Sequence, residues 1–339
     1  MMVLRRAKET DLEGIYQLSR HCGIGLTTLP QDREILQQRL LWACESFAKD
    51  VKSAGKEYYL FVLEDASGQV VGTSAIEATI GIELPFYSYK VAKHTRICHS
   101  LGIRNDYDVL SLVNDYQGRS ELCTLFLTPS FRHQKNGLLL SLARFLFIAN
   151  FPHRFAKHII AEMRGIADEQ GNSPFWESVD RHFFHMPFAE ADYLTMSTNK
   201  QFIADLMPRN SLYIQLLPLA AQAVIGKAHQ STLPAMRILQ QQGFNYNGYV
   251  DIFDAGPTIE ASCQKIRTIE ESKLLVIKNL NHHAHKKIFL VANNKLDFKA
   301  IITTANTNEQ YCSLNKKALE LLEVAAGNEV RAAPLEVMT

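Results

Sequence analysis

The stretch from Ser120 to Arg144 most constrains the fold of this chain, because it joins a strand, a turn and a helix without a break. An apolar run, Leu122 to Leu127, predicts a buried strand that stops at Pro129. A basic turn follows, from Arg132 to Gly137, and an apolar helix begins there. Backbone N–H groups, positive charge and the helix dipole together attract phosphate. The unit predicts a phosphate site; a plain strand-to-helix connection with a solvated basic turn is the alternative.

The first 80 residues predict a strand, two helices and a hairpin, in that order. The ranges are Val3–Arg6, Leu12–Leu18, Ile35–Ala43, Tyr58–Leu63 and Val70–Ile76. Followed by the basic turn, this order resembles the GNAT-type acyltransferases, which hold the pyrophosphate of coenzyme A with the motif R-x-x-G-x-G/A. Arg132 and Gly137 match the Arg and the second Gly, whereas Lys135 stands at the first Gly position.

The remaining segments predict an insertion and a C-terminal subdomain. Residues 81–119 have weak periodicity and predict an irregular insertion, in which Phe86, Tyr87 and Tyr89 either anchor the segment or shape a substrate rim. After residue 257 the pattern changes to short β-branched runs. We expect an α/β (α+β), GNAT-like fold with a central mixed sheet flanked by helices over 1–257, and a small β-rich subdomain over 258–339.

Charge and composition exclude several classes of function. A net charge of +1 gives no support for a nucleic-acid or anionic-membrane partner. The sequence contains no apolar run long enough for a membrane span, and its N-terminus lacks the apolar core of a signal peptide. The six cysteines form no CxxC pair, which favours a reduced, cytoplasmic chain. The His282–His285 segment has no partner at metal-ligand spacing, so we expect a polar loop and no metal.

Several longer stretches resemble one family, the bacterial arginine N-succinyltransferases. The stretches that carry the resemblance are Gly25–Pro30, Phe61–Asp65, Ser120–Leu127, Ala161–Gly165, Ser173–Trp176 and Asp251–Asp254. The resemblance covers most of the chain and loosens over roughly the last 70 residues. Family members carry Gly where Lys135 sits, so the local geometry at the pyrophosphate is expected to differ here.

The resemblance implies an enzyme that moves a succinyl group from succinyl-CoA to the α-amino group of L-arginine, the first step of arginine catabolism by the succinyltransferase pathway. It implies that succinyl-CoA acts as co-substrate, with no permanently bound cofactor and no covalent acyl-enzyme. A homo-oligomer or a related subunit is a possible partner. Two alternatives stay open: another amino acceptor such as ornithine, or a non-catalytic acyl-CoA-binding subunit, which the replacement by Lys135 favours.

Five residues are candidates for binding the co-substrate. We expect Arg132, Lys135 and Gly137 at the coenzyme A phosphates. Leu125 and Leu127 lie on the preceding strand, and the resemblance places succinyl-CoA contact at Leu125. In GNAT-type enzymes this strand splays from its neighbour and offers backbone groups to the acyl chain and pantetheine. The alternative for each leucine is an ordinary core position.

Glu162 and Arg164 are candidates for binding the other substrate groups, on a predicted strand from His158 to Met163. Arginine side chains suit carboxylates in bidentate geometry, and Asp or Glu suits a guanidinium. Asp168 and Glu169 follow close behind. A solvated or structural charge is the alternative for each of these residues.

His229 is the catalytic candidate, because the resemblance puts a proton donor at this position. It lies just ahead of a predicted helix over 231–242, which Ser231 or Thr232 caps. Imidazole exchanges protons near neutral pH, and a helix N-terminus would lower its pKa and keep it neutral. The order of proton transfers stays open. The alternative is a surface histidine near a helix cap.

Overall fold

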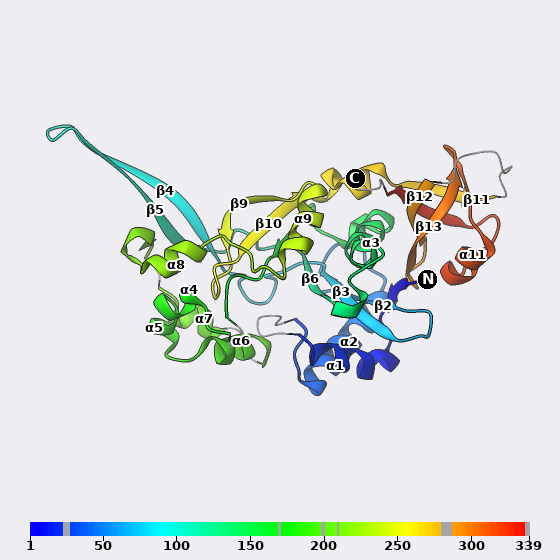
Figure 1. Ribbon diagram of the computed structural model, residues 1–339, viewed down its shortest axis with the longest axis horizontal. Helices are drawn as coiled ribbons and strands as arrows, with labels where there is room; N and C mark the ends of the chain where they lie inside the picture. Colours follow the sequence, from blue (N-terminus) through cyan, green and yellow to red (C-terminus); the bar gives the residue numbers. More distant parts are fainter. Residues whose placement is uncertain (23–27, 169–170, 198–200, 209, 279–286, 336–339) are drawn as a thin grey trace.

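The computed structural model describes residues 1–22, 28–168, 171–197, 201–208, 210–278 and 287–335. Over these residues fifteen strands join into one continuous hydrogen-bonded sheet. Figure 1 shows the sheet running from a group of strands at one end, through a helix-covered centre, to a long hairpin that projects at the other end. The predicted mixed α/β class is confirmed.

The centre of the sheet is antiparallel apart from one parallel pair. Its strands, in spatial order, are β1 (Val3–Arg6), β2 (Tyr58–Glu64), β3 (Val70–Glu77), β6 (Ser120–Leu127), β7 (His158–Glu162), β10 (Pro257–Ser262) and β9 (Asn245–Val250). The parallel pair is β6 and β7. The strand predicted from Leu122 to Leu127 is confirmed as part of β6.

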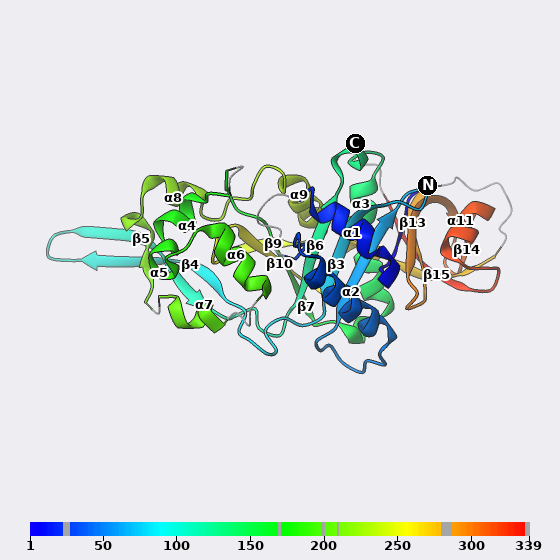
Figure 2. The same cartoon turned by 90° about the horizontal axis from the view of Figure 1, so that it is seen from below.

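Helices cover both faces of this centre because its strands are apolar on both sides. Successive side chains of a strand point to opposite faces. Tyr58, Leu60 and Val62 of β2 pack with helices α1 (Leu12–Ser19) and α2 (Arg33–Ala48) in one cluster. Tyr59, Phe61 and Leu63 pack with α3 (Asn136–Asn150) in another. Figure 2 shows α1 and α2 lying across the central strands.

A group of short helices packs beside the centre on its own apolar cluster. The helices are α4 (Pro174–Ser178), α5 (Arg181–Phe184), α6 (Phe188–Ser197), α7 (Gln201–Leu206) and α8 (Leu219–Val224), whereas α9 (Leu233–Gln241) packs on the main core through Leu239. Trp176 lies in the middle of the cluster and stacks on Phe184, with the ring centroids 5.4 Å apart. Among the residues that the structure describes, no helix combines the length and apolar character needed to cross a bilayer.

The C-terminal strands close into a small barrel. They are β11 (Lys273–Ile277), β12 (Lys287–Asn293), β13 (Lys299–Thr307), β14 (Tyr311–Ser313) and β15 (Glu329–Pro334), with α10 (Arg267–Glu271) before them and α11 (Lys316–Leu322) among them. The order β12-β15-β11-β14-β13 is closed by pairing between β12 and β13, and β13 also pairs with β1. Strand β10 (Pro257–Ser262) comes after the predicted domain boundary at residue 257. It nevertheless pairs with β7 and β9 and so belongs to the centre of the sheet.

The expectation of an irregular insertion over 81–119 is wrong. The segment contains β4 (Ser88–Cys98) and β5 (Ile103–Val113), which form an antiparallel hairpin paired from Ser88↔Val113 to Cys98↔Ile103. The short strand β8 (Leu212–Tyr213) pairs with the base of β5. The outer half of the hairpin is exposed on both faces, so its sequence lacks the alternation of a half-buried strand.

Candidate active site

The site is built on an opening between β6 and β7. The two strands pair only at their N-terminal ends, through Ser120↔Ile159 and Glu121↔Ile160. Beyond Glu121, β6 stays paired with β3 as far as Leu127 but has no further pairing with β7 in the described part of the chain. Backbone groups along this edge of β6 are therefore available to a ligand that enters between the strands.

A bulge at Thr124 redirects β6 at this opening. Thr124 has a φ of +54°, which is unusual for a β-branched residue, and the register with β3 shifts between Thr73 and Ala75. Three hydrogen bonds hold it: its N–H donates to Thr28 Oγ1 (3.1 Å), its Oγ1 lies 2.7 Å from Tyr58 Oη, and its carbonyl accepts from Thr73 Oγ1 (3.0 Å). Such support is expected for a strained backbone at a functional site. Nothing in the sequence indicated this bulge or the hydrogen bonds that hold it.

Leu125 and Leu127 follow the bulge in different environments. Leu125 is half-buried and packs against the main core, on the part of β6 that has left β7. Leu127 is buried in that core, and its carbonyl oxygen accepts a 2.9 Å hydrogen bond from Arg132 Nε. Leu125 is therefore placed at the opening, whereas the side chain of Leu127 is a core position and only its backbone reaches the turn.

The turn after β6 has the backbone of an anion-binding loop. Gln134 and Lys135 both have left-handed φ values, +51° and +66°, and Lys135 is the N-cap of α3. Lys135 thus adopts the conformation that glycine favours at this position of the motif. A Cβ built on Gly137 would meet nothing within 4 Å, so open space lies above the first turn of α3. The N-terminus of α3 therefore has open space beside it, and Arg132 and Lys135 belong to the turn that leads into it.

The chain beyond β7 is joined to the His229 segment. The N–H groups of Met163 and Gly165 donate to Pro257 O and Asp254 Oδ2, at 3.0 and 2.6 Å. The carbonyl between them, of Arg164, therefore faces the opposite edge, the one from which β6 diverges. It accepts the backbone N–H of His229 at 2.8 Å, and Gly165 forms a β-bridge with Ala228. The sequence-predicted Arg164 and His229 are thus direct neighbours.

Asp254 holds this arrangement together, and sequence reasoning did not assign it a role. Its buried carboxylate accepts from the N–H groups of Gly165 (2.6 Å) and Gly256 (2.8 Å). Both glycines are required, because a Cβ on Gly165 would lie 2.3 Å from the Asp254 carbonyl oxygen and one on Gly256 would lie 2.0 Å from the Met163 carbonyl oxygen. Burial and the neighbouring Asp251 raise the pKa of Asp254.

His229 has the environment of a proton-transfer group. Its ring is half-buried, and Ser231 places its hydroxyl 2.7 Å and its backbone N–H 3.2 Å from Nδ1. The hydroxyl can donate or accept, so Nδ1 keeps a partner whether or not it is protonated. Burial and the Arg164 guanidinium both lower the pKa of His229, which favours the neutral imidazole at neutral pH. The sequence suggested a lowered pKa because of the helix that follows; in the structure, burial and the Arg164 guanidinium lower it.

Glu162 is half-buried at the end of β7, where it pairs in register with Thr258 of β10. Glu162 precedes Arg164 by two residues, so the two side chains lie on the same face of this extended segment. The predicted His158–Met163 strand is confirmed as β7 within one residue. Asp168 accepts from Asn172 in a turn beyond this segment, while Glu169 and His282–His285 lie outside the described residues.

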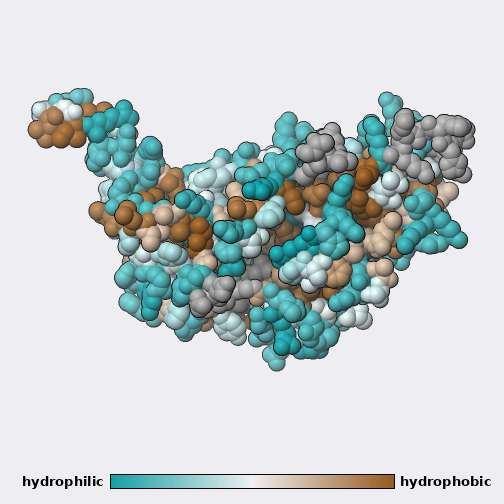
Figure 3. All heavy atoms as spheres, in the orientation of Figure 1, coloured by the Kyte–Doolittle hydropathy of each residue, from teal (hydrophilic) through white to brown (hydrophobic). Residues whose placement is uncertain are grey.

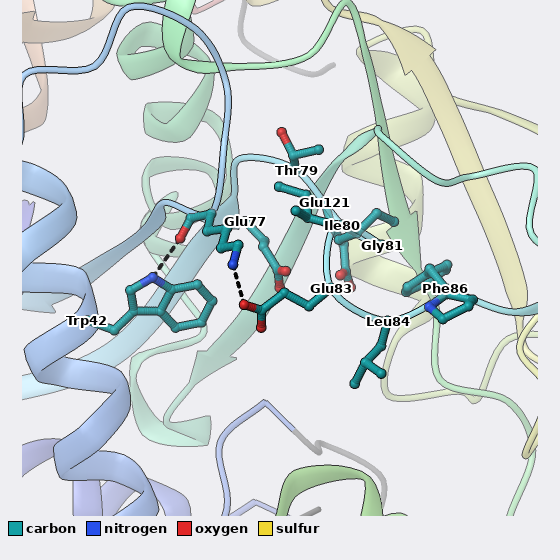
Figure 4. Close-up of a pocket in the computed structure, with 12 residues that line it drawn as sticks. Trp42, Glu77, Thr79, Ile80, Gly81, Glu83, Leu84, Phe86 and Glu121 are labelled. Carbon is teal, nitrogen blue, oxygen red and sulfur yellow. Dashed lines mark hydrogen bonds and ion pairs between the residues drawn. The ribbon is translucent and has the colours of Figure 1, made fainter. Parts of the chain in front are cut away.

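A cavity of about 460 Å³ opens at the end of β3 and the start of β6 (Figure 4). Trp42 forms one wall, and Glu77 and Glu121, which face each other across the two strands, line the base. Lys56 forms an ion pair with Glu83 at the rim. Over the residues that the structure describes, no group of three or more His, Cys, Asp or Glu side chains gathers so as to hold a metal ion.

Comparison with known proteins supports one relationship over the whole chain. A family model described as "Arginine N-succinyltransferase beta subunit" matches residues 2–268, and a model of the C-terminal domain of that subunit matches residues 275–334. The chain is 45% identical over 335 residues to the arginine N-succinyltransferase subunit beta of Pseudomonas aeruginosa, with 98% of each chain covered.

Further relatives agree. The chain is 43% identical over 344 residues to the arginine N-succinyltransferase of Yersinia pestis, covering 99% of this chain and 98% of that protein. The solved structure of arginine/ornithine succinyltransferase subunit AI from Pseudomonas aeruginosa aligns with a TM-score of 0.90 at 36% identity, covering 99% of both chains.

Proposed function

The chain belongs to the arginine N-succinyltransferase family and is an acyltransferase, and we propose that it transfers the succinyl group of succinyl-CoA to the α-amino nitrogen of L-arginine at the β6–β7 opening. The observation that carries this proposal is the meeting of three parts at one edge. These are a strand edge that leaves β7 beyond Glu121 and bends at Thr124, a cationic turn at the N-terminus of α3, and His229 fixed to Arg164. The products are N2-succinyl-L-arginine and coenzyme A.

The donor is bound by the β6–turn–α3 unit in this proposal. Arg132, Lys135 and the N–H groups around Gly137 hold the pyrophosphate, since they combine positive charge, a helix N-terminus and open space. Pantetheine then lies along β6 and takes the place of β7 as the partner of the backbone at Leu125 and Leu127. Ordering both substrates in this way can lower the barrier by roughly 7–11 kcal/mol.

His229 carries the proton in this proposal. Neutral imidazole in the Nδ1–H tautomer, which donates to the Ser231 hydroxyl, accepts one proton from the α-ammonium group at Nε2, and the amine attacks the thioester carbonyl. The C–S bond then breaks, the imidazolium gives its proton to the departing thiolate, and the second proton lost by the attacking nitrogen passes to water. Ser231 supports both charge states, because its hydroxyl accepts the Nδ1 proton of the imidazolium. The low pKa of His229 keeps the resting ring ready to accept.

Glu162 and Arg164 recognise the charged ends of the substrates in this proposal. The Arg164 guanidinium pairs with a carboxylate, and the Glu162 carboxylate pairs with a guanidinium or ammonium group. The Glu77–Glu121 cavity offers a second acidic lining on β6. Because ornithine shares the α-amino and α-carboxyl groups of arginine, the acceptor side chain decides between these substrates.

We also propose that the chain assembles with a copy of itself or with a related subunit, because the Pseudomonas relative is named as a subunit. A cytoplasmic location suits its six free cysteines, of which Cys22, Cys123, Cys263 and Cys312 are buried. The barrel of β11–β15 forms the proposed C-terminal subdomain, which starts after β10 in this proposal.

Thiol release from succinyl-CoA, measured with and without L-arginine, tests the function. The proposal expects release that depends on arginine and gives N2-succinyl-L-arginine by mass spectrometry. Parallel assays with ornithine and lysine rank the acceptors. Tight binding of succinyl-CoA without release with any of the three amino acids would support the rival function, a non-catalytic acyl-CoA-binding subunit.

A further inference from the structure

The outer part of the β4–β5 hairpin is an arm that touches nothing else in the described chain beyond its base. Every residue from Lys93 to Asp106 is exposed, and we call this range the arm. Figure 1 shows it projecting from the body at the end opposite the barrel. The arm is about 20 Å long, at about 3.4 Å per residue. An isolated two-stranded ribbon is marginally stable in water, so a paired, regular arm of this length points to a further contact.

The tip of the arm is apolar. Leu101 in the turn is 70% exposed, and Ile97 and Ile103 on the two strands are 54% and 53% exposed. Figure 3 shows these hydrophobic residues gathered at the end of the arm, with hydrophilic residues along its stem. An apolar cluster held this far from the core contributes nothing to the fold and marks a surface for another molecule.

A second apolar patch lies at the base of the same arm. It consists of Tyr213, Leu216 and Leu219, which we call the base patch, and Leu216 and Leu219 are 82% and 81% exposed. Figure 3 shows hydrophobic atoms there too, next to the point where the arm leaves the body. Tyr213 stacks against Tyr107 of β5, with ring centroids 5.2 Å apart, so the patch continues onto the arm.

Ile103 of the tip shares one face of the arm with Tyr213 of the base patch, whereas Ile97, which pairs with Arg104, lies on the other face. Directly paired residues of an antiparallel hairpin have side chains on the same face, and so do residues two apart. Cys98 pairs with Ile103 and His94 pairs with Tyr107, so Ile103 at the tip lies on the same face as Tyr107 and Tyr213 at the base. One arm length separates the two patches, so a chain cannot cover its own base patch with its own tip.

We propose that the arm docks beside the arm of a second copy of this chain, antiparallel to it, so that each tip covers the base patch of the other. In a pair of arms related by a two-fold axis, each tip lies at the base of the other arm. The two tips and the two base patches are then all covered in the same contact. The distribution of charged residues along the arm also favours the antiparallel arrangement. From Arg96 to Arg104 the tip carries cations and no acid, while Asp106 and Asp108 lie toward the base together with Lys93. This surface goes beyond the assembly proposed above and does not depend on the chemistry of the site.

Sedimentation velocity of the full chain over a concentration series tests the first part of the proposal. The unchanged chain is expected to form a dimer or an even-numbered multiple. The double variant Leu101→Asp with Ile103→Asp should move the equilibrium toward smaller species by at least roughly tenfold, since it places charge in an apolar contact. Leu274→Asp is the matched control, because Leu274 is a 40% exposed leucine on β11 in the barrel. A monomeric unchanged chain, or an assembly that tolerates the tip variants, overturns the proposal.

Cross-linking tests the pairing of tip with base. Cys98 is exposed at the tip, and Leu216→Cys would add a thiol to the base patch. A disulfide needs Cα atoms within about 7 Å, so within one chain these two positions are too far apart. Mild oxidation should give a reducible dimer of Leu216→Cys and none of Leu216→Cys with Cys98→Ser. Absence of the dimer, or its formation in both variants, overturns the antiparallel arrangement.

Discussion

The backbone N–H of His229 donates a 2.8 Å hydrogen bond to the carbonyl oxygen of Arg164. This bond fixes the histidine segment to the chain that continues β7, on the edge from which β6 has diverged. The same arginine lowers the pKa of the imidazole through its guanidinium. Burial is the larger cause of the lowered pKa, and Arg164 adds to it while also fixing the position of the proposed proton carrier.

The guanidinium of Arg164 should control where activity is lost at low pH. A neutral His229 accepts the proton, so activity falls as pH drops through its pKa, and a lowered pKa places this acid limb below the usual value of about 6.5. Arg164→Gln removes a cation that disfavours the imidazolium, so the pKa and the acid limb of the kcat profile should both move to higher pH. Arg237→Gln, an exposed arginine on α9, is the control. An unshifted limb in Arg164→Gln would rule out this coupling.

Asp254 should act as a positioning residue. In Asp254→Asn the amide NH2 faces one of the two N–H groups, of Gly165 or Gly256, that the carboxylate now accepts. The loss of that bond loosens the segment that holds His229. Misplacement of a catalytic group by about 1 Å can cost up to about 10²-fold, so kcat should fall while KM for succinyl-CoA stays within about twofold.

Asp65→Asn is the control for Asp254→Asn, because Asp65 also accepts N–H groups, from Ser67 and Gln69, in the turn between β2 and β3. Equal losses of kcat in the two variants would show a general effect of such turns. A rise in KM for succinyl-CoA without a change in kcat would place Asp254 outside the machinery around His229.

Substitutions of Gly137 should test where the phosphates of coenzyme A bind. Open space lies above it, and its φ is not left-handed, so the protein itself tolerates a side chain there. In the series Gly137→Ala and Gly137→Val, KM for succinyl-CoA should rise with side-chain size, by about tenfold or more for valine, because the added atoms fill the space proposed for phosphate. KM for arginine should stay within about twofold. Equal effects on both substrates would move the pyrophosphate elsewhere.

Lys135 should contribute charge at some cost in backbone strain. Its φ of +66° costs an L-residue about 1–2 kcal/mol, which glycine avoids. Lys135→Gly should therefore leave the free energy of unfolding unchanged within about 1 kcal/mol, because glycine also loses more backbone entropy on folding. KM for succinyl-CoA should rise severalfold and depend less on salt. Lys135→Asn, which also tolerates this conformation, should behave alike; a KM equal to that of the unchanged chain would show that the ammonium group does not reach the phosphates.

Apolar pattern predicted the parts of the fold that are buried. The run Leu122–Leu127 lies within β6, and the predicted strands Tyr58–Leu63 and Val70–Ile76 lie within β2 and β3. The order of the first strands and helices also holds, since apolar residues on both faces of β2 require cover on both sides. The arm was missed because exposed strands need no alternation and Lys93–Asp106 shows none.

The site was predictable only in part. The basic turn and His229 have chemistry that the sequence displays, and the family resemblance pointed to the histidine. The bulge at Thr124 was not predictable, because it lies inside an unbroken apolar strand and depends on Thr28 and Tyr58 from distant segments. Asp254 lies in a stretch that carries the family resemblance but had no assigned role, and its contact with Gly165 becomes visible only when β7 and β10 are paired.

The pH dependence of kcat for His229→Ala, in a variant shown to be folded, tests the central claim most directly. General acid–base catalysis is typically worth about 10²–10⁴-fold, so the account predicts a loss of kcat in that range. It also predicts disappearance of the acid limb, because no imidazole remains to titrate. His229→Gln, which keeps a polar side chain of similar length, should lose as much. A loss smaller than about tenfold with an unchanged pH profile would contradict the assignment of proton transfer to His229.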